Sequence, residues 1–217
     1  KKLKIESAME HDFLIGYKSY VEGLNLNSWE VYALMQHHGL PTRLLDWSES
    51  ALVALYFALT SEPEADGNRG VWYLEPGELN KLTTDRKEVY CPAGIIANKF
   101  EVSGGKILNF DKYLPPNLTP LDEDLDYPDF PLAIYASRNI KRIANQTGCF
   151  TVHGADPSSI NDLLESNYCD LIELRIDSPE ERLKMVKTLD SLGINEEFIY
   201  QDLDSLCARI KQRWMGK

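Results

Sequence analysis

Polar side chains gather at two places in the sequence where apolar elements meet. The first is Gln36–Arg43, where two imidazoles, a hydroxyl and a guanidinium follow the end of an expected helix. A planar guanidinium can grip an anion through two parallel hydrogen bonds, so this segment could form a polar binding site. A structural account is equally open: a histidine at a helix C-terminus can bond free carbonyls, and Arg43 can pair with Asp46.

The second place is Arg138–His153, where an expected short helix leads into an expected strand. Arg142 and Gln146 are four residues apart and project from the same face of a helix. Phe150 alternates with its neighbours in the strand that follows. The alternative is an exposed helix face followed by an edge strand, with no ligand.

Several common sites are absent from the sequence. It contains no phosphate loop, dinucleotide glycine fingerprint, nucleophile elbow or HExxH motif. Its four cysteines form no CxxC pair or Cys/His ladder, so we expect no metal site, and we expect reduced, buried thiols. The formal net charge of −11 opposes a surface that attracts nucleic acid or anionic lipid as a whole.

Hydrophobic periodicity predicts an α+β chain, a single domain with a mixed or split β-sheet flanked by helices. Residues 91–131, rich in proline and acidic side chains, are expected to form a long irregular excursion. The last helix has an apolar stripe and is expected to dock on the core. The expected helices are 6–20, 27–39, 51–59, 178–193 and 203–214, and the expected strands are 44–47, 70–74, 132–135, 149–153 and 171–176.

Three strings resemble the central and C-terminal signatures of the FRG domain family. They are Gln36–Trp47 (QHHGLPTRLLDW), Ala54–Ala58 (ALYFA) and Arg142–His153 (RIANQTGCFTVH), and the first is highly specific. Gln201–Leu206 (QDLDSL) is a weaker echo. The resemblance is strongest over residues 25–213, and we expect residues 1–217 to be one FRG domain.

The family is named for a Phe/Tyr-Arg-Gly motif near its start, and no such triplet precedes Trp29. We therefore expect an FRG domain that lacks its first strand. An upstream segment or a partner chain could supply that strand.

FRG domains resemble the ADP-ribosyltransferase superfamily in the order of their motifs, which implies a related fold and NAD as substrate. On this resemblance an arginine grips the pyrophosphate, an aromatic ring stacks on the nicotinamide, and Gln146 stabilises the cation-like ribose of the transition state. We expect Thr42–Trp47 on a central strand that meets Gln146–Phe150. The resemblance implies catalytic roles for Gln146, Arg142 and Asp46 and cofactor-binding roles for Thr42, Arg43, Trp47, Ser48, Tyr56 and Phe150.

The resemblance thus implies an NAD-dependent ADP-ribosyltransferase-like effector, for example a bacterial toxin or phage-defence protein that modifies a macromolecule. The acceptor could be protein or nucleic acid. The alternative is a non-catalytic FRG module of a larger protein that senses a nucleotide or a partner. No apolar run is long enough to span a bilayer and no signal core follows the basic start, so we expect a cytoplasmic protein. Asp46 and Arg142 are expected to be partly buried and paired, because unpaired charges beside leucines are costly.

Overall fold

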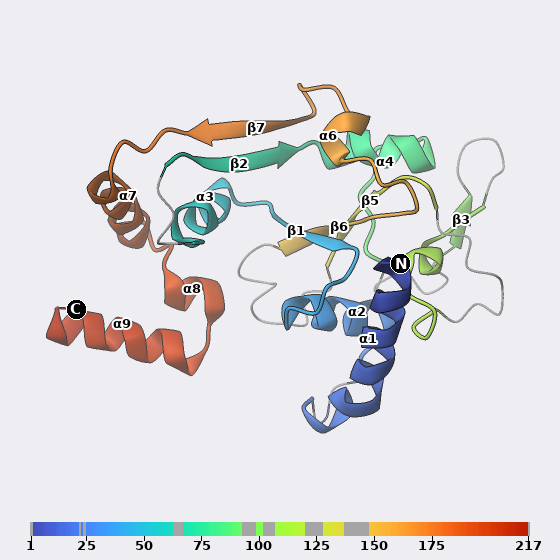
Figure 1. The fold of residues 1–217 in the computed structure, drawn as a ribbon, viewed down its shortest axis with the longest axis horizontal. Helices are drawn as coiled ribbons and strands as arrows, with labels where there is room; N and C mark the ends of the chain where they lie inside the picture. Colours follow the sequence, from blue (N-terminus) through green and yellow to red (C-terminus); the bar gives the residue numbers. More distant parts are fainter. Residues whose placement is uncertain are drawn as a thin grey trace. The chain divides into compact units, whose positions relative to one another are not determined.

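The computed structural model describes residues 2–21, 23, 25–62, 67–92, 99–101, 107–119, 128–136 and 148–216. These residues form helices and short strands in three small sheets, which confirms the predicted α+β class and the split sheet (Figure 1). Contacts divide the chain into two compact units: residues 1–46, 75–137 and 150–164, and residues 47–74, 138–149 and 165–217. Each unit is assembled from three separate pieces of the sequence.

The first unit contains the N-terminal helices and most of the three-stranded sheet. The strand order of that sheet is β1-β6-β5, with β6 in the middle. The expectation of a central strand over Thr42–Trp47 was therefore wrong, because β1 has one described neighbour and lies at an edge. The elements are α1 (Lys2–Gly16), η1 (Tyr17–Ser19), α2 (Ser28–His37), α4 (Pro76–Thr84), β3 (Lys99–Glu101), β4 (Ile107–Asn109), η4 (Phe110–Tyr113), β5 (Leu132–Tyr135) and α6 (Ile160–Leu163), with parts of β1 (Leu44–Ser48) and β6 (Gly148–Val152).

Local signals explain why α2 starts and ends where it does. The Asn27 side chain accepts a hydrogen bond from the Glu30 backbone N–H at 3.0 Å, and the Glu30 carboxylate accepts one from the Asn27 N–H at 2.9 Å, a complete capping box. Gly39, at φ 78°, ends the helix in the left-handed region that glycine adopts without strain. Pro41 follows, so the chain turns and enters β1.

The core of the first unit uses part of the segment expected to be irregular. Leu108, Phe110, Tyr113, Leu114 and Leu118 are all buried. The segment therefore contributes to the core, and within its described part β3, β4 and η4 are regular elements. Trp29 Nε1 of α2 donates to Asp111 Oδ1 of η4 at 3.0 Å, which joins the segment to α2.

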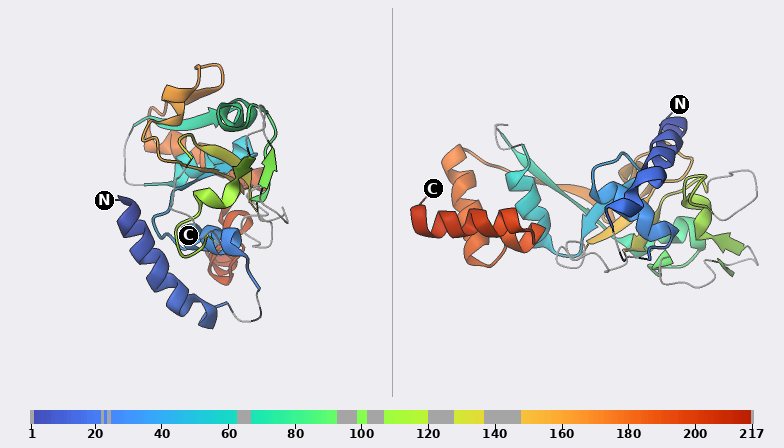
Figure 2. Two further views of the ribbon diagram at one scale, coloured as in Figure 1. Left: turned by 90° about the vertical axis from the view of Figure 1, so that its right-hand side faces the viewer. Right: turned by 90° about the horizontal axis from the view of Figure 1, so that it is seen from below.

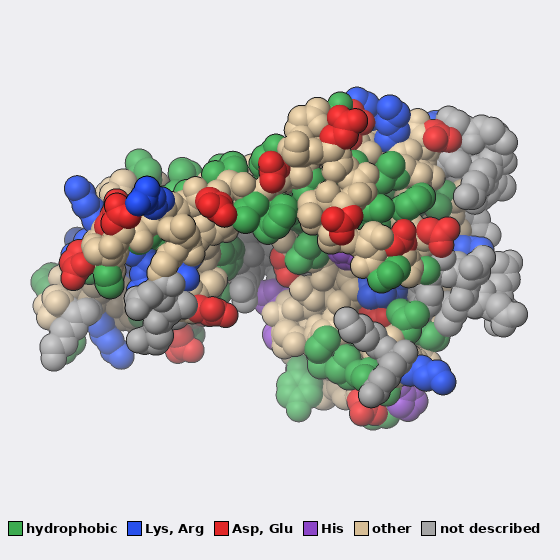
Figure 3. Space-filling view, turned by 45° about the horizontal axis from the view of Figure 1, so that its top comes forward, with side chains coloured by type: hydrophobic (Ala, Val, Ile, Leu, Met, Phe, Trp, Pro, Cys, Tyr) green, Lys and Arg blue, Asp and Glu red, His purple; other side chains and the backbone are tan. Residues whose placement is uncertain are grey.

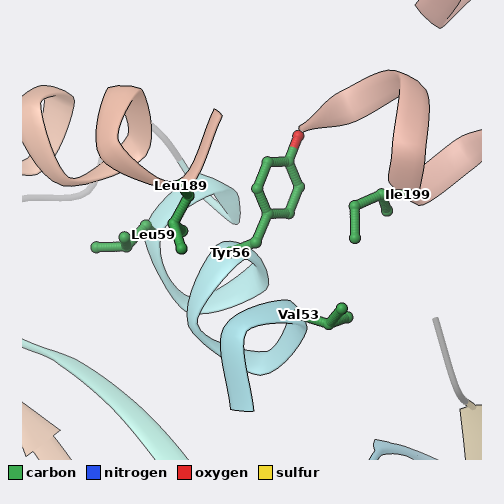
Figure 4. Close-up of a cluster of buried hydrophobic side chains, with 5 residues drawn as sticks. All are labelled: Val53, Tyr56, Leu59, Leu189 and Ile199. Atoms are coloured by element: carbon green, nitrogen blue, oxygen red, sulfur yellow. The ribbon is translucent and has the colours of Figure 1, made fainter. Parts of the chain in front are cut away.

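The second unit packs helices beside a two-stranded antiparallel sheet. Strands β2 (Arg69–Leu74) and β7 (Cys169–Leu174) pair with Val71 opposite Ile172 and Trp72 opposite Leu171. Helices α3 (Ala51–Thr60), α7 (Pro179–Ser191) and α8 (Glu196–Tyr200) share the buried cluster shown in Figure 4: Val53, Tyr56, Leu59, Leu189 and Ile199. Helix α7 begins at Ser178, whose hydroxyl accepts the Glu181 N–H at 3.2 Å, as its capping sequence predicts.

The last helix, α9 (Leu203–Met215), was expected to dock on the core through its apolar stripe, but most of that stripe is exposed. Leu203, Ile210 and Trp214 are exposed, and Ser205 is its buried residue. Figure 2 shows α9 as a straight helix at the C-terminal end of the chain. An amphipathic pattern predicts that a helix has an apolar face, but it does not determine whether another element covers that face.

The surface is acidic, as the net charge requires. Figure 3 shows carboxylates spread over the described part of one face and interspersed with lysines and arginines. Within the described residues, no helix combines the length and apolar composition needed to cross a bilayer. The described cysteines form no disulfide, and only Cys169 among them is buried, so the expectation of four buried thiols was wrong.

Candidate functional site

Arg43 is the centre of a polar cluster in the first unit. The residue stands between the end of α2 and the start of β1, and its side chain is 12% exposed. Its Nε donates to Glu6 Oε2 at 2.9 Å and its Nη1 to the His153 carbonyl at 2.9 Å, and its Nη2 donates to the Tyr113 carbonyl. These contacts tie α1, η4 and the end of β6 to one guanidinium.

The Glu6 carboxylate receives three hydrogen bonds and is buried. Besides Arg43 Nε, it accepts the Arg43 backbone N–H at 3.2 Å and the Tyr32 hydroxyl at 2.5 Å. Tyr32 is fully buried, and burial raises the pKa of its hydroxyl, so the phenol stays protonated and donates. The Tyr32 oxygen also accepts the Arg43 N–H at 2.8 Å. The Glu6 carboxylate thus accepts hydrogen bonds from Tyr32 on α2 and from Arg43, the residue before β1.

A second chain of hydrogen bonds leads from this turn to solvent. The Thr42 hydroxyl donates to Gln36 Oε1 at 2.6 Å, and Gln36 Nε2 donates to Asp46 Oδ2 at 2.6 Å. The Thr42 oxygen also accepts the Leu44 N–H at 3.1 Å, which fixes the hydroxyl. Asp46 is exposed, so the chain of bonds ends in a carboxylate that is oriented and accessible.

His153 meets the same cluster through its backbone. Its N–H donates to the Arg43 carbonyl at 2.9 Å, and its own carbonyl accepts the guanidinium. Burial, and then the positive charge of Arg43, lower the pKa of the imidazole below its usual value. The ring is therefore neutral at neutral pH.

Glu10, one helical turn after Glu6, is fully buried. Asn117 Nδ2 donates to its Oε2 at 2.9 Å, while its Oε1 has no hydrogen-bond partner within the described part of the chain. Burial raises the pKa of this carboxyl, and the charge of nearby Glu6 adds to the effect.

The structure brings several of the predicted site residues together. Thr42, Arg43 and Asp46 belong to the cluster, and Phe150 is buried on β6, the strand beside β1. Asp46 is hydrogen-bonded as expected, but it is exposed rather than partly buried. Arg43 pairs with Glu6 and not with Asp46, so the structural account of that turn named the wrong partner.

The remaining predicted residues lie elsewhere. Trp47 and Ser48 are half-buried and belong to the second unit, where the Ser48 hydroxyl accepts the Ser50 N–H at 3.1 Å before α3 begins. Tyr56 is buried in the cluster of Figure 4, between side chains of α7 and α8. Burial raises the pKa of its hydroxyl to about 12. Gln146 and Arg142 lie outside the described residues.

Sequence reasoning missed Glu6, Tyr32 and Tyr113. A usable signal was present in the first helix, because Glu6 and Glu10 are four residues apart and share one face with Phe13 and Tyr17, which were expected to cover the core. Two carboxylates on a packing face require partners.

Comparison with known proteins agrees with the resemblance over the first third of the chain. No curated protein and no solved structure matches the sequence. A family match covers residues 1–67, which contain α1, α2, β1 and α3, and thus Glu6, Arg43 and Asp46. The family that this part of the chain matches is the FRG domain.

Proposed function

We propose that the chain is an NAD-using, ADP-ribosyltransferase-like effector of the toxin or phage-defence kind, which modifies a macromolecule. Two observations support the proposal: the FRG match, and the position of Asp46 within it. FRG domains and ADP-ribosyltransferases are similar in the order of their motifs, and on this basis the proposal assigns the NAD site to the residues around Arg43.

The oriented carboxylate of Asp46 is the observation that carries the proposal. Thr42 fixes the amide of Gln36, and the amide fixes the carboxylate, so Asp46 is held in one orientation while it remains exposed. A carboxylate accepts hydrogen bonds from the two hydroxyls of a ribose and attracts positive charge that develops on the sugar. A preformed orientation makes that attraction more effective, because no reorganisation is needed during the reaction.

The reaction would be a substitution at the nicotinamide ribose. The bond between C1′ and the nicotinamide nitrogen breaks, and nicotinamide leaves with the bonding electrons. The acceptor's nucleophilic atom forms a new bond to C1′ and loses its proton to water. In this scheme Asp46 stabilises the cation-like sugar, and Gln146 and Arg142 keep the roles that the resemblance implies.

The experiment is incubation of the chain with NAD, with nicotinamide measured by chromatography and labelled ADP-ribose followed into a lysate. Protease and nuclease treatment of the labelled product identifies the acceptor class. We expect Asp46→Asn to reduce nicotinamide release at least about tenfold, because it removes the charge and keeps an acceptor for Gln36. Asp12→Asn is the matched control, because Asp12 is an exposed aspartate on α1 and makes none of the hydrogen bonds described above.

A second function is favoured by the contacts of Arg43. Its guanidinium is engaged with Glu6 and two carbonyls of the same unit, as expected for a residue that holds a fold together. In a non-catalytic module that senses a nucleotide or a partner, Arg43 would have this structural role and would take no part in a reaction. NAD binding without nicotinamide release would select this function, and the absence of both at millimolar NAD would refute the role of NAD altogether.

A further inference from the structure

Helix α1 is attached to the first unit by its carboxylates. Among its described side chains the buried ones are Glu6 and Glu10, and Glu10 is fully buried, whereas Leu3, Ile5 and Ile15 on the same helix are exposed. Helices normally dock through an apolar face, so this arrangement is unusual. Figures 1 and 2 show α1 as a straight helix that starts at the N-terminus.

The group that Glu6 contacts is built to receive an anion. Two N–H groups of Arg43 and the hydroxyl of Tyr32 converge on one carboxylate, with donor–acceptor distances between 2.5 and 3.2 Å. The donors come from residues outside α1. Charge-assisted hydrogen bonds of this kind bind carboxylates and phosphates alike, since both present paired oxygens to an arginine.

The second buried carboxylate weakens the attachment of α1. Glu10 Oε1 is buried and has no hydrogen-bond partner among the described residues. A buried polar atom without a partner costs the full desolvation penalty of that atom. Part of the stabilisation that Glu6 provides is therefore offset one turn away on the same helix.

We propose that Arg43 and Tyr32 form a binding site for a phosphate-class anion, and that Glu6 fills this site as an internal competitor carried by α1. Binding of the anion displaces Glu6 and releases α1 from the unit. The inference does not depend on the proposed transferase activity. It concerns phosphate alone, whether free or part of a nucleotide.

Hydrogen exchange on the unmodified chain tests the displacement. Millimolar inorganic phosphate should accelerate exchange of the α1 amides, relative to chloride at the same ionic strength, because phosphate competes with Glu6. ADP-ribose at the same concentration distinguishes a nucleotide phosphate from free phosphate: whichever acts at lower concentration is the better ligand. Unchanged or slower exchange in α1 with both ligands would overturn the proposal.

Titration calorimetry with inorganic phosphate tests the competition directly. We expect Glu6→Ala to bind phosphate about tenfold more tightly than the unmodified chain. The change removes the carboxylate that fills the site at Arg43 and Tyr32 in most molecules. Glu10→Gln is the matched control on the same helix: it should bind no more tightly, because relief of the buried charge holds α1 in place. A gain of about threefold or less for Glu6→Ala would contradict the proposal. Should that variant fail to fold, the exchange experiment on the unmodified chain decides.

Discussion

Replacement of Arg43 by alanine is the most severe test of the cluster. The change removes the cation of an ion pair in which the two side chains are 12% and 7% exposed. It leaves the Glu6 carboxylate in a buried site and deprives the Tyr113 and His153 carbonyls of a donor. The expected result is a large loss of stability in the first unit.

The magnitude follows from the burial of the pair. Removing one partner of a buried ion pair costs about 3–5 kcal/mol, because the remaining charge stays uncompensated. Release of α1 lets Glu6 reach water and limits the loss, so we expect about 4 kcal/mol. With a urea m-value of about 2 kcal/mol per molar, the midpoint falls by about 2 M.

Urea denaturation followed by circular dichroism provides the assay. Arg209→Ala is the control, because Arg209 pairs with Glu197 at 2.6 Å in an ion pair whose side chains are 57% and 32% exposed. A surface pair of this kind contributes about 0–1 kcal/mol. The double variant Glu6→Ala with Arg43→Ala should lose at least about 2 kcal/mol less unfolding free energy than the sum of the two single losses. The reason is that it leaves neither charge of the pair buried without its partner.

The reasoning would be refuted if Arg43→Ala cost no more than Arg209→Ala. Strict additivity of the two changes at Glu6 and Arg43 would also refute it, because independent residues do not share an ion pair.

Three further predictions concern the same unit and the segment that follows β5. Glu10→Gln should raise the free energy of unfolding by about 1–2 kcal/mol at pH 7, because it removes a buried charge that lacks a full set of partners. Since the pKa of Glu10 is raised in the folded state, this gain should shrink as pH falls toward 4.5, where the unfolded chain also takes up the proton; denaturation at several pH values measures it. The pKa of His153 is lowered, so its contribution to stability is present above pH 6.5 and is lost as pH falls below that value. His153→Gln should remove this part of the acid sensitivity, and an unchanged pH profile would contradict the assignment. Gln146→Ala should abolish nicotinamide release while leaving the melting temperature within a few degrees, and normal release would exclude Gln146 from the reaction.

The sequence determined the local structure well. The capping box at Asn27 and Glu30, the stop at Gly39 and Pro41, and the Ser178 start of α7 each depend on residues within one helical turn. Such signals are complete in the sequence because the interacting atoms are neighbours along the chain. The α+β class followed from the same periodicities.

The division into two units was not visible, since each unit is built from three pieces and the chain passes between them repeatedly. No single linker therefore separates two hydrophobic cores along the sequence. The sequence shows that α3 is apolar nearly all round and that α9 has one apolar stripe, but only tertiary packing decides that the residues around Tyr56 are buried and that the stripe of α9 is exposed.

The partner of Arg43 shows most clearly what the tertiary structure decided. Asp46 is the nearest carboxylate in sequence, but it lies within β1 and is exposed, whereas Arg43 lies at the bend before β1 and its side chain is 12% exposed. Arg43 therefore faces the interior, where Glu6 reaches it from α1, 37 residues earlier. Asp46 faces solvent and is held by Gln36. The sequence supplied the residues of the cluster, and the packing of α1 against α2 and β1 decided which of them hold the fold and which remain available to a ligand.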